Sequence, residues 1–86
     1  MPTVVMYSTG FCPYCVRARM LLDHKRVIYT DIRVDLEPEL RAEMIQRSGR
    51  TSVPQIFIDD FHVGGCDDMY ALERQGRLDP LLHETE

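Results

Sequence analysis

Short apolar runs rich in β-branched residues alternate along this chain with segments of helical periodicity. The runs at residues 4–7, 27–34, 53–58 and 61–63 predict strands. Residues 14–25, 38–48, 66–76 and 78–83 predict helices, of which the last is one or two turns. The order β-α-β-α-β-β-α predicts an α/β fold with a four-stranded mixed sheet flanked by helices. We expect both β-α-β steps to be right-handed crossovers and the last two strands to form an antiparallel hairpin.

Particular residues within this pattern are expected to be buried, to cap helices or to end them. Val16, Met20 and Leu21 or Leu22 recur at helical spacing and predict the buried face of the first helix. Asp35 is the expected N-cap of the second helix, and Cys66 or Asp67 of the third. Gly49 follows the second helix as a stop signal.

Length and charge limit the possible functions. The 86 residues predict a single domain over residues 1–86. A net charge of −4 argues against a nucleic-acid partner, which requires a basic face. No run reaches the roughly 18 apolar residues of a membrane span, and residues 1–7 lack the features of a signal peptide. We therefore expect a cytoplasmic, reducing location without membrane association, and a monomer.

Cys12-Pro13-Tyr14-Cys15 stands between the first strand and the first helix. Thiols at i and i+3 in a first helical turn can form a disulfide, and the helix dipole favours a thiolate at Cys12. This context predicts a redox pair. A Cys-Cys-Cys-His zinc site would have to recruit Cys66 and His62, and an inert core pair is the other alternative. We expect no metal.

Two later segments predict a ligand groove. A proline beginning a strand leaves the Val53 backbone groups free to pair with an extended thiol substrate, although Pro54 could simply begin an edge strand. Gly64-Gly65 allows close backbone approach, and the helix that follows offers N–H groups at Cys66 and Asp67 to a carboxylate. The Asp67 side chain could meet an ammonium, or only cap its helix.

These three segments together resemble the glutaredoxins over nearly the whole chain. Cys12-Pro13-Tyr14-Cys15 is similar to the family's dithiol site, Ser52-Val53-Pro54-Gln55-Ile56-Phe57 to its T-V-P-x-[IV]-F segment, and Gly64-Gly65-Cys66-Asp67-Asp68 to its G-G-[CS]-D-D loop. The bacterial glutaredoxin-three subgroup is the most similar. The resemblance implies a thioredoxin-like fold and a cis Val53–Pro54 peptide.

The resemblance also implies a function. Cys12 would attack disulfides of proteins or mixed disulfides with glutathione, Cys15 would resolve the intermediate, and glutathione would be the reducing cosubstrate. The γ-glutamyl end of glutathione carries a carboxylate and an ammonium on one carbon, which suits the proposed groove. The residues implied in binding it are Tyr14, Arg50, Val53, Pro54, Gly65, Cys66, Asp67 and Asp68.

Two other functions remain open. An iron–sulfur carrier would hold a cluster through Cys12 of two chains, but Pro13 stiffens the backbone where such family members usually have Gly or Ser. A thioredoxin-like carrier reduced by a flavoprotein would have no use for the segment 64–68 as a tripeptide site.

Three positions depart from the pattern or stand apart from it. Thr9 occupies the place of a lysine common in the family, and Arg41 and Arg50 are the candidates to replace it. Phe11 is bulkier than the threonine usual in the subgroup and is expected to cover the outer side of the thiol. Cys66 is interpreted as a small buried hydrophobe, with a regulatory thiol as the alternative.

Overall fold

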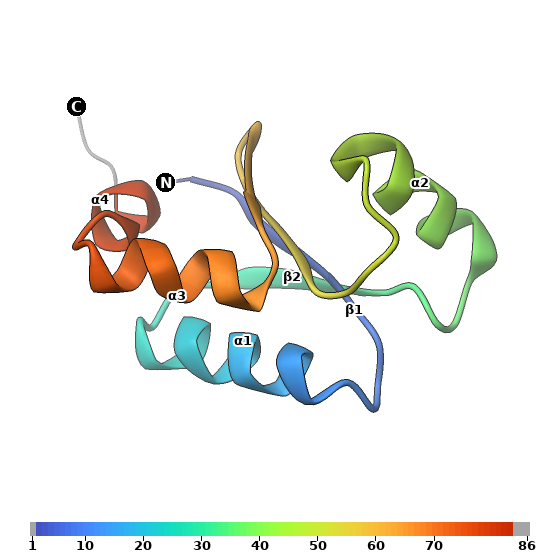
Figure 1. Cartoon of the computed structure of the whole chain (residues 1–86), viewed down its shortest axis with the longest axis horizontal. Helices are drawn as coiled ribbons and strands as arrows, with labels where there is room; N and C mark the ends of the chain where they lie inside the picture. Colours follow the sequence, from blue (N-terminus) through green and yellow to red (C-terminus); the bar gives the residue numbers. More distant parts are fainter. Residues whose placement is uncertain (1, 84–86) are drawn as a thin grey trace.

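The computed structural model describes residues 2–83, which form a four-stranded sheet and four helices (Figure 1). The strands are β1 (Val4–Ser8), β2 (Tyr29–Arg33), β3 (Gln55–Ile58) and β4 (Phe61–Gly64). The helices are α1 (Pro13–His24), α2 (Pro38–Ser48), α3 (Cys66–Arg74) and α4 (Leu78–Leu82). The predicted order of elements is therefore confirmed. None of the described helices has both the length and the apolar character needed to cross a membrane.

The sheet has the strand order β2-β1-β3-β4. β1 is parallel to β2 and antiparallel to β3, and β3 and β4 form the predicted antiparallel hairpin. The expectation of two parallel β-α-β crossovers is thus wrong for the second step, since α2 connects strands that run in opposite directions. An apolar strand pattern reports burial and carries no information about strand direction.

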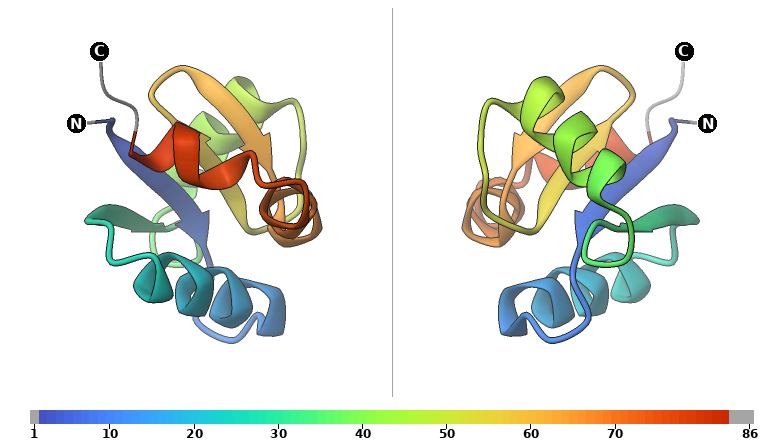
Figure 2. Two further views of the ribbon diagram at one scale, coloured as in Figure 1. Left: turned by 90° about the vertical axis from the view of Figure 1, so that its left-hand side faces the viewer. Right: turned by 90° about the vertical axis from the view of Figure 1, so that its right-hand side faces the viewer.

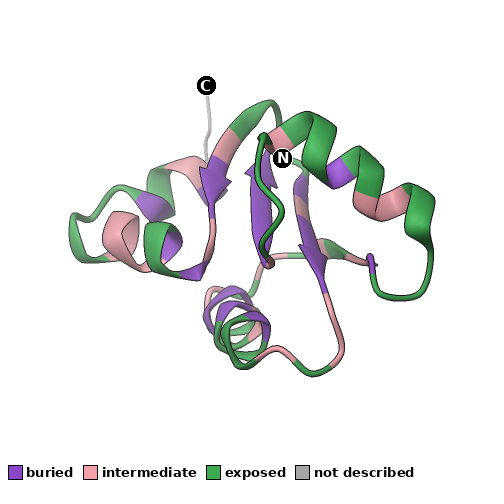
Figure 3. Cartoon of the chain, turned by 45° about the vertical axis from the view of Figure 1, so that its right-hand side comes forward, coloured by how far each residue is buried: buried purple, intermediate pink, exposed green. Residues whose placement is uncertain are grey.

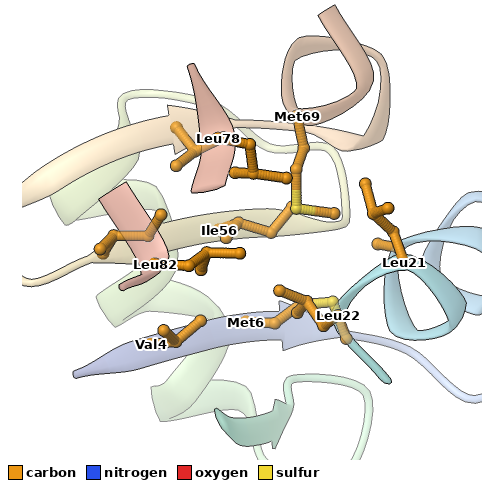
Figure 4. Packing of buried hydrophobic residues seen from close by; sticks show 11 residues of the cluster. Val4, Met6, Leu21, Leu22, Ile56, Met69, Leu78 and Leu82 are labelled. Atoms are coloured by element: carbon orange, nitrogen blue, oxygen red, sulfur yellow. The ribbon is translucent and has the colours of Figure 1, made fainter. Parts of the chain in front are cut away.

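The two faces of the sheet bury two separate apolar clusters. Val4 and Met6 of β1 face α1, α3 and α4, and Tyr7 faces α2, as the two-residue period of a strand requires. Leu22, Met69 and Leu82 approach the first face from the three helices (Figure 4). α2 alone covers the other face, where Met44 packs with Tyr7 and Phe57 (Figure 2).

Helix α1 is rotated relative to the prediction. Val16 is 46% exposed and Met20 is 63% exposed, whereas the buried residues are Cys15, Ala18, Leu21 and Leu22. Cys15, Ala18 and Leu22 follow an i, i+3, i+7 spacing, which puts Val16 and Met20 on the solvent side. The predicted burial of Leu21 or Leu22 is confirmed, whereas that of Val16 and Met20 is wrong, because the small Ala18 carries little hydrophobic signal. Figure 3 shows the outward faces of the helices exposed against mostly buried central strands.

Helix and strand ends also differ from the predictions. Glu37 holds the N-cap position of α2 without a side-chain cap, while Asp35 binds the Arg33 guanidinium and the Gly10 N–H instead. Gly65 is the N-cap of α3, so neither Cys66 nor Asp67 caps it. β2 is shorter than residues 27–34, and β3 begins at Gln55 rather than Val53.

Candidate redox site

Cys12 occupies the N-cap position of α1, directly before Pro13 in the first turn. Its thiol is partly buried and donates to the Val53 carbonyl oxygen, with the sulfur and oxygen 3.7 Å apart. The first turn of the helix contains no acidic residue, so its unpaired N–H groups act on Cys12 without an opposing carboxylate. The Cys12 sulfur therefore lies between the N-terminus of α1 and a carbonyl oxygen that accepts from its thiol.

Cys15 lies one helical turn further and is completely buried. Burial raises the pKa of its thiol to about 11, and the neighbouring Cys12 sulfur adds to the rise. The backbone at Thr9 and the Arg19 guanidinium act in the opposite direction. Cys12 is partly exposed and Cys15 is buried, so the two thiols differ in access to solvent. The raised pKa keeps Cys15 protonated at neutral pH.

A groove of about 250 Å³ opens beside this pair. All eight residues predicted to bind a ligand line it, and so does Ser52: the full set is Tyr14, Arg50, Ser52, Val53, Pro54, Gly65, Cys66, Asp67 and Asp68. Three chain segments far apart in the sequence thus form one site. The Val53–Pro54 peptide is cis, as the resemblance implied.

The two aspartates of α3 have different surroundings. Asp68 accepts hydrogen bonds from the Gly65 N–H at 2.9 Å and from Arg50 at 3.0 Å. The Gly65 N–H, followed by the Arg50 guanidinium, lowers the pKa of Asp68 below its usual value. Gly64 has a φ of 112°, and a Cβ there would collide with the Asp68 carboxylate. Asp67 is exposed on the groove wall, and its carboxylate is available to a ligand.

The arginines suggested as replacements for a lysine at Thr9 occupy different places. Arg50 lines the groove but is paired with Asp68, and both side chains are 49% exposed. Arg41 does not line the groove; it donates to the Thr51 carbonyl oxygen at 3.4 Å. The cations closest to the loop before Cys12 are Arg19, which donates to the Thr9 carbonyl oxygen, and Arg33, whose guanidinium lies against Gly10. Neither was predicted.

Ser52 is the groove residue that the sequence prediction missed. Its carbonyl and hydroxyl oxygens accept from Gln55 Nε2 at 3.0 and 3.3 Å, and Gln55 Oε1 pairs with His62 Nε2 at 2.7 Å. Its position directly before Val53-Pro54 was the available signal. Burial, and then the nearby Arg50 charge, lowers the pKa of His62, which favours a neutral imidazole beside Gln55.

Cys66 and Phe11 were the subjects of two further predictions. Cys66 is buried, and burial raises the pKa of its thiol, in agreement with a small apolar filler beside the groove. Phe11 is 97% exposed and therefore does not shield the Cys12 sulfur as expected. Within residues 2–83, no cluster of three or more His, Cys, Asp or Glu side chains is arranged to hold a metal ion.

Comparison with known proteins agrees with this geometry. The family model described as Glutaredoxin matches residues 4–63. A glutaredoxin of Pseudomonas aeruginosa is 57% identical over 82 residues, covering 95% of this chain and 98% of the relative. Glutaredoxin 3 of Escherichia coli K12 is 55% identical over 82 residues, with 95% and 99% covered. A crystal structure of a buckwheat glutaredoxin–glutathione complex superimposes with a TM-score of 0.86 at 34% identity, covering 94% of this chain and 76% of that chain.

The fold is therefore thioredoxin-like, with a thiol pair at the N-terminus of its first helix. The chain belongs to the glutaredoxin family, and its activity is that of a thiol–disulfide oxidoreductase.

Proposed function

We propose that this protein uses glutathione as its reducing cosubstrate to reduce protein disulfides and glutathione mixed disulfides through Cys12 and Cys15. The observation that supports this most is the groove, which places the exposed Asp67 carboxylate and the N-terminal N–H groups of α3 on the same wall. A γ-glutamyl group presents an ammonium to the Asp67 carboxylate and a carboxylate to the N–H groups of α3. The similar buckwheat glutaredoxin was crystallised as a complex with the same tripeptide.

In the first step the Cys12 thiolate attacks a substrate disulfide. A bond forms between Cys12 Sγ and one substrate sulfur, and the other substrate sulfur leaves as a thiolate that takes up a proton. With a glutathione mixed disulfide, the groove orients the glutathionyl half so that its sulfur is the one attacked. Val53 O, already 3.7 Å from Cys12 Sγ, belongs to the backbone that faces this bond.

The second step has two routes. On protein disulfides, Cys15 attacks the Cys12 mixed disulfide, forms the Cys12–Cys15 disulfide and releases the reduced protein. Two glutathiones then restore the dithiol and leave as glutathione disulfide, which balances the electrons. On glutathione mixed disulfides, a second glutathione attacks the Cys12–glutathione bond directly and Cys15 is not used.

Cys12 is the leaving group when a second glutathione attacks the Cys12–glutathione bond, and stabilisation of its thiolate by the α1 N-terminus would matter chiefly on that route. A more stable thiolate is more abundant but also a weaker nucleophile, with a Brønsted slope of about 0.4–0.5, so the gain in attack is small. The same stabilisation makes Cys12 a better leaving group from the mixed disulfide. We infer that the α1 N-terminus mainly accelerates release of the glutathionyl intermediate.

The proposal is tested by supplying the reduced protein with one electron donor at a time. Turnover of a small glutathione mixed disulfide is expected with glutathione and glutathione reductase alone. Turnover only with a flavoprotein thioredoxin reductase would indicate a thioredoxin-like carrier instead. A visible chromophore in anaerobically purified protein that is lost with Cys12→Ser would indicate an iron–sulfur carrier.

A further inference from the structure

Gln55, the first residue of β3, is a completely buried amide in an apolar strand. The other three residues of β3 are apolar and buried, and Gln55 and Ser8 are the only buried polar side chains within residues 2–83. Burial of an amide is costly unless its hydrogen bonds are made inside the protein. The partners of Gln55 therefore show what its amide is used for.

The Gln55 side chain has one partner at each end. Nε2 donates to the Ser52 carbonyl oxygen at 3.0 Å, and Oε1 lies 2.7 Å from Nε2 of His62. A carbonyl oxygen can only accept, so the amide nitrogen must face Ser52 and the amide oxygen must accept from a protonated His62 Nε2. The imidazole is itself stacked on the Phe57 ring, with centroids 4.7 Å apart. His62 thus orients the amide.

The contact with Ser52 sets the direction of the peptide that joins Ser52 to Val53. This peptide is trans, so its carbonyl and its N–H point in opposite directions. The carbonyl oxygen points to the buried Gln55 amide, and the Val53 N–H therefore points away from it. Within residues 2–83 no protein group accepts from this N–H, and Val53 lines the groove.

No second contact holds the same peptide in the described part of the chain. The peptide before it is held at the Thr51 carbonyl oxygen, where Arg41 donates at 3.4 Å. The peptide after it is held at the Val53 carbonyl oxygen, where the Cys12 thiol donates at 3.7 Å. Loss of the Gln55 amide would therefore leave the peptide between these two free to rotate.

We propose that Gln55, oriented by His62, is a positioning residue of the groove: it directs the Val53 N–H toward a bound glutathionyl group. This inference rests on the proposed function, in which the groove orients the glutathionyl half of a mixed disulfide. Glutathione is a peptide, and its carbonyl oxygens can accept from a backbone N–H as those of an added strand do. Gln55 and His62 would touch neither the substrate nor the reacting sulfurs.

The chemical step is the attack of Cys12 already described. With glutathione disulfide, a bond forms between Cys12 Sγ and one glutathionyl sulfur, and the other glutathione leaves as a thiolate that takes up a proton. A side chain that only stabilised the start of β3 would affect this attack equally for every disulfide. A positioning role instead predicts slower attack on glutathione disulfide alone, because a disulfide without peptide groups gains nothing from the Val53 N–H.

The test compares two oxidants of the reduced protein, glutathione disulfide and 4,4′-dithiodipyridine, which has no peptide group. A Cys15→Ser background stops the reaction at the Cys12 adduct, which is counted by mass spectrometry after an acid quench. Gln55→Met keeps the length of the side chain but has no N–H to donate. Its reaction with glutathione disulfide should slow about three- to tenfold, the effect of one misdirected hydrogen bond, and that with 4,4′-dithiodipyridine should change less than about twofold.

Two variants of His62 and one of α4 complete the series. His62→Leu keeps Gln55 but removes the group that orients its amide, so a smaller selective loss is expected. His62→Gln carries an amide that can donate from a similar place, and it should restore the wild-type rate. Leu82→Ala is the control for lost stability, since it opens a cavity in the apolar cluster on the other face of the sheet and should change neither rate.

Equal slowing with both disulfides, or wild-type rates in Gln55→Met, would overturn the proposal. If Gln55→Met does not fold, His62→Leu gives the decision. A selective loss that His62→Gln restores supports the proposal, and wild-type rates or equal slowing refute it. Wild-type protein whose Cys12–glutathione adduct is not released by glutathione would instead refute the proposed function, while the rates of adduct formation still decide the role of Gln55.

Discussion

The two cysteines are three residues apart, yet their surroundings have opposite physical character. Cys12 is partly exposed beside an open groove whose Asp67 carboxylate is available to a ligand. Cys15 is completely buried, and burial raises the pKa of its thiol to about 11. Under the proposed function the groove side, around Cys12, attacks the substrate, and the packed side, around Cys15, resolves the intermediate.

The strongest test of this division is Cys12→Ser. A serine hydroxyl is not ionised at neutral pH and cannot form a disulfide, so turnover should fall by about a hundredfold or more on every substrate. Assays with a small glutathione mixed disulfide and with a protein disulfide both measure it. Retained activity on either substrate would mean that Cys12 is not the attacking sulfur.

Cys15→Ser should separate the two substrate classes. The groove and Cys12 stay in place, so turnover of glutathione mixed disulfides continues. Reduction of protein disulfides that require two thiols is lost. The same two assays measure the ratio of the activities, and a parallel loss of both would show that Cys15 also serves the groove side.

The sequence indicated the groove side far better than the packed side. Cys12-Pro13-Tyr14-Cys15, Val53-Pro54 and Gly64-Gly65 are compact motifs whose chemistry can be judged locally. Arg19 of α1 and Asp31 of β2, in contrast, lie 12 positions apart, and their ion pair depends on how α1 packs against the sheet. No local pattern encodes such a contact, so this ion pair could not be predicted.

The fold, too, was predictable where it depends on local sequence and not where it depends on contacts between distant elements. Element order follows from hydrophobic period, and the β3–β4 hairpin was predicted from the two neighbouring apolar runs. The direction of β3 and the rotation of α1 were not predictable, because each depends on packing against distant elements. Ala18 shows why: its small side chain lets α1 approach the sheet, although its hydrophobic signal is weak.

On the groove side, Asp67→Asn should raise the KM for glutathione about tenfold, with little change in kcat. An amide keeps the shape but loses the charge that binds the ammonium, and a charged hydrogen bond is worth about 1.5–3 kcal/mol before solvent exposure reduces it. The matched control is Asp60→Asn, an exposed aspartate in the β3–β4 turn. A change in kcat alone, or the same KM change in the control, would contradict a ligand contact at Asp67.

The smallest expected effect is that of Asp35→Asn on the free energy of unfolding, and this effect should depend on pH. Asp35 accepts from Arg33 at 2.7 Å and from the Gly10 N–H at 3.2 Å, so it ties the end of β2 to the loop before Cys12. The Arg33 hydrogen bond, with the Gly10 N–H, lowers the pKa of Asp35 from 3.8 to about 2. The pKa of Asp35 is lower in the folded state than in the unfolded state, so its charge stabilises the fold fully at pH values above the unfolded-state pKa of 3.8. This stabilisation is lost as the pH falls through the folded-state pKa of about 2.

The measurement is the urea midpoint of wild-type and Asp35→Asn protein from pH 6.5 down to pH 3. The variant should be slightly less stable at pH 6.5, and the difference should shrink below about pH 4, where the unfolded carboxyl takes up a proton first. Arg33→Gln completes a double-mutant cycle, since Asp35→Asn should matter less once the guanidinium is gone. A difference that stays constant over this pH range would mean that the Asp35 charge contributes nothing to stability.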